Sequence, residues 1–404
     1  MDRRLRIIQV VHAFPPALGG IETHAYELSR ELASTGADVV VHTSAQAGGE
    51  AVDAELSREG VKVKRHFAIK LPFFSSLVLI PCLPVFVALE KGDVVCSHGF
   101  GGIVPFAAAI GAKLSGKKFY WTVHGLPKFK GPAKWLAGAY GMLIAPVISA
   151  CSTKIICVSQ TLADEAGKKM GSGAARKIVV IPNGIGKEFR EAGEKGADWK
   201  KESAQADGKN PADAGRKTPS FVILFAGRLD RSKGVFMLLD AFEKFHSLHK
   251  DSALKFVGPD EGQKGKLAAL AKEKGLPVEF GTMPRDKMPG VYSSASVCVL
   301  PSEYEGFGLS VLESWACDTP AISTHVGVAP QFLREAFGEE TAGVFLFEDE
   351  ESLLACLERV YSSREEMKKR WAAEARKALA KYAWEEAAQQ TIRLINEEGE
   401  GRTD

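Results

Sequence analysis

The sequence lacks most of the simple markers that assign a function. Its 52 Lys and Arg residues against 50 Asp and Glu leave a net charge of +2, which gives no reason to expect a nucleic-acid partner. Its seven cysteines form no C-x-x-C pair and no zinc-like spacing, so we expect reduced thiols in a cytoplasmic protein rather than a disulfide framework. No D-x-D is present, so we expect no metal site and no other cofactor. No G-x-G-x-x-G follows a predicted strand, which argues against a dinucleotide dehydrogenase.

Uninterrupted apolar runs are also few. Two uncharged stretches of 19 residues, 71–89 and 135–153, are long enough to span a bilayer by length alone. Pro81 and Pro84 interrupt the first and the second is rich in small residues, so we expect buried helices. Peripheral contact with a membrane surface is the alternative, and a true span is the least favoured. The apolar run after the basic N-terminus is short and ends in prolines, which predicts a first strand rather than a signal peptide.

What the sequence does contain is a regular alternation of short Val- and Ile-rich strands with longer segments of helical periodicity. This pattern predicts βαβ units and parallel sheets, and the length predicts two domains. The alternation covers 1–185, stops in the charged, Gly- and Ala-rich segment 186–220, and resumes over 221–380. We therefore predict an α/β fold of two Rossmann-like domains facing across a cleft, joined by a charged linker or insertion. A helical tail, 381–404, is expected to cross back to the first domain.

The loops after the predicted strands are the places to look for chemistry, because an open parallel sheet binds ligands beyond the carboxyl ends of its strands. Gly19 and Gly20 follow the first strand and precede a helix, where backbone amides bind anions. A tight turn with nothing bound is the alternative. Arg228 and Lys233 follow the first strand of the second half and suit a diphosphate. The alternative for these two is a pair of solvated surface cations.

Two carboxylates are the least expected feature of the second half. In PSEYEGFGLSVLE, Glu305 and Glu313 lie around a glycine-bearing, otherwise apolar turn, with no basic neighbour in sequence. A buried carboxylate without a partner is costly. Position alone leaves Glu305 as a site residue or a solvated loop residue, and Ser310-x-x-Glu313 also fits a capping box that only stabilises a helix start. His124, at another strand end, is likewise structural or functional on position alone.

Taken together and in this order, the motifs GGIE, IPNG, GRLDRSKG and PSEYEGFGLSVLE resemble the retaining glycosyltransferases of the GT-B fold. The likeness is strongest to the GT4-type, group 1 enzymes that use nucleotide sugars, and it covers nearly the whole chain. Glu305 and Glu313 match the E-x7-E signature of that family. The resemblance implies transfer of a hexose-type sugar from a nucleotide-diphosphate sugar to a sugar or lipid-linked acceptor, with cations in place of a metal.

The resemblance also implies a role for each site residue. Glu305 would contact hydroxyls of the donor sugar, and Glu313 would accept hydrogen bonds from the ribose hydroxyls. Arg228 and Lys233 would neutralise the departing diphosphate, so that no carboxylate need be a covalent nucleophile. The remaining donor-binding positions would be His124 at the sugar, Met283 at the base, and the backbone at Gly20, Gly306, Phe307, Gly308 and Leu309.

Departures from the family pattern and competing functions accompany this interpretation. Trp315 and Asp318 stand where relatives more often carry small residues and glycine, and Asp318 would alter the loop beside Glu313. A nucleotide-sugar epimerase of the same fold, or a non-catalytic sugar-nucleotide-binding subunit, would keep a similar nucleotide site. The complete E-x7-E with its Arg and Lys favours transfer. Lysines near the two uncharged stretches favour a lipid-linked or membrane-proximal acceptor at the first domain.

Overall fold

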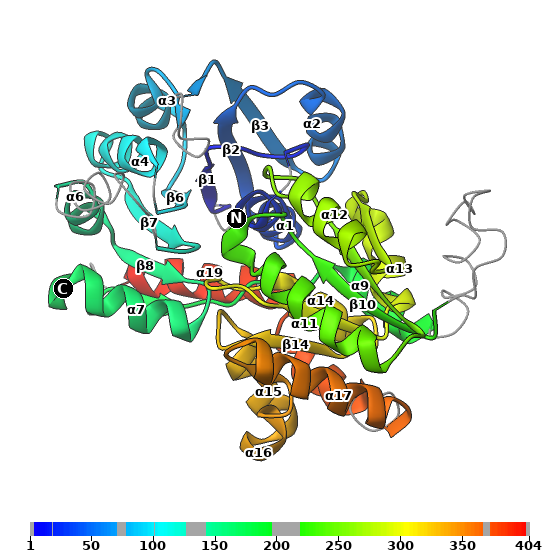
Figure 1. Cartoon of the computed structure of the whole chain (residues 1–404). Helices are drawn as coiled ribbons and strands as arrows, with labels where there is room; N and C mark the ends of the chain where they lie inside the picture. Colours follow the sequence, from blue (N-terminus) through cyan, green and yellow to red (C-terminus); the bar gives the residue numbers. More distant parts are fainter. Residues whose placement is uncertain are drawn as a thin grey trace. The chain divides into compact units, whose positions relative to one another are not determined.

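The computed structural model describes residues 4–17, 19–70, 78–100, 102–126, 143–195, 219–366 and 372–400 (Figure 1). The chain divides into two compact units. The first unit consists of Met1–Gly184 and Tyr382–Asp404, and the second of Ile185–Lys381. Each unit has its own parallel sheet, so the predicted α/β fold of two Rossmann-like domains is confirmed.

The first unit is built on a seven-stranded sheet in the order β3-β2-β1-β6-β7-β8-β9, in which every neighbouring pair is parallel. Its central strands are buried along their length because a parallel sheet is covered on both faces. The chain winds outward from β1 in one direction and from β6 in the other, which places a topological switch point between these two strands. The strands are β1 (Arg6–Val10), β2 (Asp38–Ser44), β3 (Val61–His66), β6 (Val94–His98), β7 (Lys118–Val123), β8 (Lys154–Cys157) and β9 (Ile178–Val180).

The last helix of the chain, α19, belongs to the first unit. Its residues Trp384, Ala388 and Ile395 are buried in the same core cluster as Leu28 and Leu32 of α1. The helices of this unit are α1 (Gly20–Ser34), α2 (Gly49–Arg58), α3 (Leu83–Leu89), α4 (Ile103–Leu114), α6 (Ala145–Cys151), α7 (Gln160–Met170), α8 (Ser172–Ala175) and α19 (Trp384–Glu400), and a small antiparallel ribbon pairs β4 (Ile69–Lys70) with β5 (Val78–Leu79).

Backbone contact explains the glycine of the IPNG motif. A Cβ atom added to Gly184 would lie 2.1 Å from the backbone nitrogen of Trp384, the first residue of α19. No side chain fits at that distance, because both atoms belong to a fixed backbone. Glycine therefore lets the last helix begin directly against the loop that ends the first long segment of the unit.

The second unit is built on a six-stranded parallel sheet in the order β12-β11-β10-β13-β14-β15. Its strands are β10 (Phe221–Ala226), β11 (Ser252–Val257), β12 (Val278–Gly281), β13 (Val297–Leu300), β14 (Ala321–Thr324) and β15 (Leu346–Phe347). Its helices are α9 (Lys187–Lys195), α11 (Val235–Leu248), α12 (Lys264–Glu273), α13 (Met288–Ser294), α14 (Leu309–Ala316), α15 (Ala329–Phe337), α16 (Glu339–Ala342), α17 (Glu350–Glu366) and α18 (Ala372–Leu379), with 3₁₀ turns η3 (Arg231–Lys233) and η4 (Arg285–Lys287).

The start of the expected linker, 186–220, is in fact part of the second unit. Residues 187–195 form α9, which contacts α13 and α14, and its Phe189 is completely buried. The charged composition concealed this, because Phe189 and Ala192 alone, three residues apart on one helix face, provide the buried surface. Residues 196–218 of the expected linker lie outside the described residues.

The two uncharged stretches differ from the expected buried helices. Only α3 and α6 are described in them, since 71–77 and 127–142 lie outside the described residues. In α3 Leu83 and Val87 are buried, but Val85, Phe86 and Leu89 are exposed by 51%, 38% and 79%. The helix therefore presents an apolar face outward. None of the helices in the described ranges is long and apolar enough to cross a membrane.

Candidate functional site

The loop after β10 carries the first cation of the candidate site in the second unit. Asp230 begins the 3₁₀ turn η3 by accepting a hydrogen bond from the backbone nitrogen of Ser232 at 2.8 Å. Gly234 follows with a left-handed φ of 69°, and a Cβ there would lie 1.9 Å from the carbonyl oxygen of Pro301. This close approach holds the loop against the end of β13. Lys233, the residue between, is thereby brought beside the loop that carries the first carboxylate.

Glu305 is paired with Lys233. The Lys233 Nζ lies 2.7 Å from Glu305 Oε1, and Ser302 Oγ donates to the same oxygen at 2.8 Å. Both ionic side chains are only 16% exposed. The alternative of a solvated loop carboxylate is therefore wrong for Glu305, and so is that of a solvated surface cation for Lys233.

Glu313 has a different cation, Arg285. Its carboxylate is 8% exposed and accepts from Arg285 Nη1 at 3.0 Å and from the Tyr292 hydroxyl at 2.9 Å. Burial, and next the charge of Glu313, raise the pKa of Tyr292 well above its ordinary value, so this hydroxyl remains a donor at neutral pH. The acid that had no basic neighbour in sequence thus has one in space.

The capping-box alternative for Glu313 is wrong. Helix α14 begins at Leu309, and its N-cap is Gly308, which has a left-handed φ of 86°. Ser310 therefore lies inside the first turn and cannot be the capping residue. The Glu313 side chain points to Arg285 and Tyr292, away from the helix start.

The glycine-bearing loop before α14 is fixed by its backbone. Phe307 is buried, and its carbonyl oxygen accepts a hydrogen bond from the backbone nitrogen of Val328 at 2.8 Å. The left-handed Gly308 then turns the chain into α14, so that the amides of Gly308 and Leu309 stand at a helix N-terminus. Gly306 precedes them in the same loop. A helix start of this kind favours an anion.

Arg285 is the residue that sequence reasoning missed. It lies two positions after Met283, in the loop that follows β12, and its Nε is 3.4 Å from Glu188 of α9. Its guanidinium also lies over the ring of Phe189, 5.0 Å from the centroid. The requirement that a buried carboxylate have a partner was the available signal, because Arg285 is a cation at a strand's carboxyl end like Arg228 and Lys233.

Arg228 and Met283 are more exposed than the paired residues. Arg228 Nη1 lies 4.0 Å from Glu261, and 56% of its side chain is exposed. Met283 is 38% exposed. Asp318, the departure from glycine, adopts a left-handed φ of 56°, and Arg376 holds its carboxylate with two hydrogen bonds of 3.1 and 2.6 Å. This pair compensates for the unusual residue at the end of α14.

The remaining predicted residues, Gly20 and His124, belong to the first unit. Gly20 begins α1 after the N-cap Gly19. His124 follows β7, and its Nε2 lies 3.4 Å from Nδ1 of His98, the last residue of β6. The ring of His24 lies 4.5 Å from that of His124, measured between centroids. Sequence reasoning missed both neighbours of His124, because a single histidine in a helix or strand carries no pattern.

Burial keeps these histidines neutral. It lowers the pKa of His24 from 6.5 to about 4, although the hydrogen bond to Asn183 raises it in part. Burial, followed by the nearby His24, lowers the pKa of His98 and of His124 well below the ordinary value. All three imidazoles therefore carry a lone pair at neutral pH.

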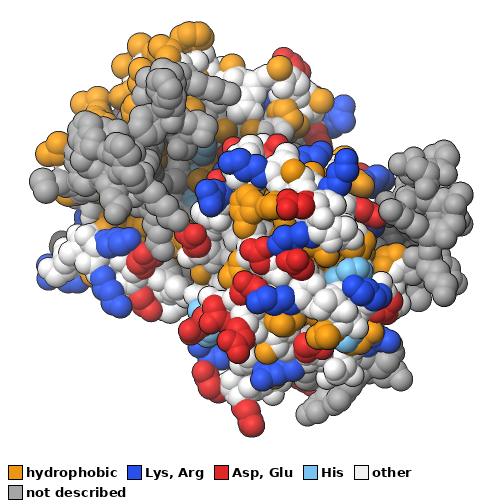
Figure 2. Space-filling model, viewed as in Figure 1, with side chains coloured by type: hydrophobic (Ala, Val, Ile, Leu, Met, Phe, Trp, Pro, Cys, Tyr) orange, Lys and Arg blue, Asp and Glu red, His pale blue; other side chains and the backbone are white. Residues whose placement is uncertain are grey.

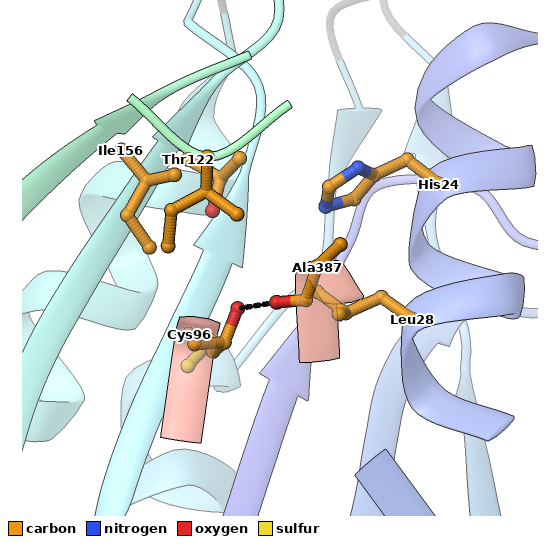
Figure 3. Close-up of a pocket in the computed structure, with 8 residues that line it drawn as sticks. His24, Leu28, Cys96, Thr122, Ile156 and Ala387 are labelled. Carbon is orange, nitrogen blue, oxygen red and sulfur yellow. Dashed lines mark hydrogen bonds between the residues drawn. The ribbon is translucent and has the colours of Figure 1, made fainter. Parts of the chain in front are cut away.

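A small cavity adjoins the cluster. It has a volume of about 10 Å³, and His24 projects into it from α1 (Figure 3). A cavity of this size has room for about one water molecule. It is lined by His24, Leu28, Cys96, Thr122, Ile156, Ile181, Ala387 and Thr391.

Comparison with known proteins gives consistent matches over both units. Residues 18–189 match the model of Glycosyltransferase Family 4, and residues 207–378 match that of Glycosyl transferases group 1. The chain is 25% identical over 338 residues to a phosphatidylinositol N-acetylglucosaminyltransferase of Arabidopsis thaliana, covering 82% of this chain and 69% of that protein. It is 26% identical over 348 residues to a glycogen synthase of Mycobacterium tuberculosis, covering 80% and 78%. Its fold is similar to the crystal structure of Anabaena HepE in complex with UDP and glucose, with a TM-score of 0.75, 16% identity, and coverage of 98% and 100%.

Proposed function

Because the chain belongs to the glycosyltransferases of family 4 and group 1, with the GT-B fold, we propose that it is a retaining hexosyltransferase using a nucleotide-diphosphate sugar. One observation carries this proposal: Glu305 and Glu313 are each held by a separate cation in the second unit. HepE, which has a similar fold, was crystallised with UDP and glucose. That makes a UDP-sugar the first donor to test.

The pair of Lys233 and Glu305 suits the two parts of a sugar diphosphate. A carboxylate accepts hydrogen bonds from sugar hydroxyls, whereas phosphate oxygens require donors and positive charge. Glu305 would bind the sugar and Lys233 the diphosphate, at a separation of 2.7 Å in the pair itself. The more exposed Arg228 would be the second cation on the diphosphate, together with the amides of Gly308 and Leu309.

Glu313 would bind the ribose. Arg285 and Tyr292 each donate one hydrogen bond to it, to different carboxylate oxygens. Each oxygen has a further lone pair, so the ribose hydroxyls can donate to the same carboxylate without displacing its partners. The backbone at Met283, in the same loop as Arg285, would contact the base, while His124 and the amide at Gly20 would contribute from the first unit.

The proposed reaction breaks the bond between the anomeric carbon and a diphosphate oxygen, and that oxygen keeps the bonding pair. Positive charge then develops on the sugar and negative charge on the leaving group, where Lys233, Arg228 and the helix amides would stabilise it. The acceptor hydroxyl attacks from the side that the diphosphate leaves, so the configuration is retained. The departing oxygen takes the proton of the hydroxyl, and all atoms and charges balance without a covalent enzyme intermediate.

An apolar surface on the first unit supports a lipid-linked or membrane-proximal acceptor. The exposed faces of α3 and its neighbours include Phe67 and Leu89, exposed by 73% and 79%, and Leu114 at the end of α4, exposed by 71%. Figure 2 shows apolar side chains gathered over the part of the molecule that contains α3. Lys64, whose side chain is 46% exposed, lies three residues before Phe67. Apolar residues beside a cation suit an anionic lipid surface.

The named relatives bracket this choice of acceptor. The name of the Arabidopsis relative includes phosphatidylinositol, whereas the mycobacterial relative is a glycogen synthase. The exposed apolar face is the observation that favours the lipid-linked class over a soluble glucan.

Hydrolysis of nucleotide sugars tests the proposed function. UDP-, GDP- and ADP-hexoses would be incubated with the protein, and NMR would identify the anomer of sugar first released. We expect one donor to be hydrolysed with retention. Lys274→Ala is a matched control, because this lysine pairs with Asp240 and Glu243 at the surface of the same unit.

Three other outcomes would contradict the proposal. An inverted product would exclude retention. Interconversion of two nucleotide sugars would show an epimerase. Tight nucleotide binding without turnover, even with lipid and glucan acceptors present, would show a non-catalytic subunit.

A further inference from the structure

The histidine cluster in the first unit has more structure than a single sugar contact requires. His24 lies on α1, His98 ends β6, and His124 follows β7. One ring nitrogen from each lies within 4.8 Å of the others. We propose that these three histidines bind a divalent transition metal ion, with zinc as the best fit. This site lies wholly within one unit and does not depend on the proposed sugar transfer.

The separation of His98 and His124 fits metal ligation better than a hydrogen bond. Their Nδ1 and Nε2 atoms are 3.4 Å apart, which is longer than the usual range for hydrogen bonds between these groups. Two nitrogens bound tetrahedrally to one zinc, each at about 2.0–2.1 Å, are separated by about 3.4 Å. The two rings are therefore already spaced as zinc would hold them.

Buried amide oxygens orient two of the rings. Gln9 Oε1 lies 2.6 Å from His98 Nε2, and Asn183 Oδ1 lies 2.8 Å from His24 Nδ1. An amide oxygen only accepts, so each of these ring nitrogens carries the proton. The lone pair is then left on His98 Nδ1 and on His24 Nε2. Metal-binding histidines are commonly fixed in this way, by a hydrogen bond to the nitrogen that does not bind the metal.

His24 Nε2 has a lone pair without a protein partner among the described residues. The atom is completely buried and accepts no hydrogen bond from them. A buried polar atom left in this state is costly unless a ligand or water satisfies it. Zinc would satisfy it, and so would one water in the adjoining cavity of about 10 Å³ (Figure 3). The two accounts differ in whether the protein takes up metal.

The charge state agrees with ligation. Metal binding requires deprotonated imidazoles, and the lowered pKa of His24, about 4, means that no proton has to be displaced from it at neutral pH. Three imidazole nitrogens make up the protein part of an open zinc site, whose fourth position is taken by water or another small ligand. Because His124 is also proposed to touch the donor sugar, zinc and sugar would share this residue.

Zinc titration of the full-length protein tests the proposal. The protein would be treated with a strong chelator, dialysed, and titrated with Zn²⁺ in competition with a chromophoric chelator. We expect uptake of one equivalent. Substitution with Co²⁺ should give the intense visible absorption of a tetrahedral site, a readout that needs no activity and no variant.

Variants locate the metal within the cluster. His124→Gln is the main one, because His124 is only half-buried and the fold should tolerate the change. It should weaken zinc binding at least about a hundredfold, and Gln9→Met should weaken it about ten- to a hundredfold by releasing the ring of His98. His246→Gln is the matched control, since His246 is a partly buried histidine of the second unit that bonds to Ser252.

Two results would overturn the proposal. A wild-type protein that takes up no zinc in the competition would leave the single water as the partner of His24. Zinc uptake that is equally strong in wild type and in folded His124→Gln would place the metal elsewhere on the chain. In either case the donor-sugar assay remains a separate measurement, so failure here does not bear on the proposed transfer.

Discussion

The two units treat their buried ionisable groups in opposite ways. In the second unit, Glu305 and Glu313 are buried in the charged form, because Lys233 and Arg285 compensate for the lost hydration. In the first unit, the histidine cluster is buried in the neutral form, and amide oxygens rather than charges contact two of its rings. One unit thus offers fixed charge to a ligand, and the other offers lone pairs.

This difference predicts where each unit is sensitive. A buried ion pair fails when one partner is removed, because the other charge is left without compensation. A buried neutral histidine fails when the solution becomes acid enough to protonate it. The second unit should therefore respond most to substitution, and the first to pH and to metal.

The largest expected effect comes from removing the diphosphate cations. Lys233→Ala should lower turnover at least about a hundredfold, equivalent to about 3 kcal/mol of transition-state stabilisation, and Arg228→Ala should lower it less. Lys233 is buried against Glu305 whereas Arg228 is mostly exposed, which sets the order. Turnover of each variant would be compared with that of Lys274→Ala. Near-normal rates in both would remove the diphosphate assignment.

Breaking the second ion pair should affect stability and binding together. Arg285→Met should lower the free energy of unfolding by about 2 kcal/mol, less than for a fully buried pair because the arginine is 31% exposed. Adding Glu313→Gln should restore part of the stability but not nucleotide affinity. Urea denaturation and nucleotide titration measure the two effects. Lys255→Met is the control, since its partner Glu279 is 65% exposed, and an equal loss there would argue against a special role for Arg285.

Acid should destabilise the first unit through His24. Its pKa is about 4 in the folded protein and 6.5 when unfolded, so the unfolded chain binds the proton first as the pH falls. Stability is complete above pH 6.5 and decreases between pH 6.5 and 4, by about 2 kcal/mol at pH 5. Denaturation midpoints of metal-free protein would be compared with those of His24→Gln. An equally steep pH dependence in that variant would assign the effect to other groups.

The two carboxylates should separate binding from chemistry. Glu313→Gln should weaken binding of the free nucleoside diphosphate about tenfold, the loss of one charged hydrogen bond, while Glu305→Gln should mainly slow turnover. Calorimetric titration of each variant measures the affinity. Unchanged affinity in Glu313→Gln would leave this residue as a structural partner of Arg285 and Tyr292.

The smallest expected effect concerns lipid. Leu89→Lys should reduce flotation of the protein with anionic liposomes at low salt by about threefold, since it places a charge in the apolar face of α3. Leu248→Lys is the control, because Leu248 is 69% exposed but lies in the second unit. Absence of flotation for the wild-type protein would favour a soluble acceptor.

The sequence carried most of the fold because parallel sheets leave a local pattern. Buried strands such as β6 and β10 are continuous apolar runs, and the loops after them bear the charged residues. Lys233 and Glu305 could be predicted from these loops. Their mutual pairing could not, because it depends on the close approach of Gly234 to Pro301.

What the sequence could not reveal are contacts between elements distant in the chain. Arg285 and Glu313 are 28 residues apart, and nothing local distinguishes that arginine from a surface residue. The histidine cluster draws on α1, β6 and the loop after β7, so its members are separated by a helix or more. Helix α9 escaped notice for the opposite reason, since its few apolar residues are local but surrounded by charge.

Helix α19 sets the order in which the molecule can be completed during synthesis. The core of the first unit includes Trp384, Ala388 and Ile395, which leave the ribosome only after all of the second unit. The second unit is one continuous segment and can close as soon as its last helix emerges. The first unit, although translated first, must wait with the surface of α1 uncovered until the final helix arrives, and it is the natural client of a chaperone in that interval.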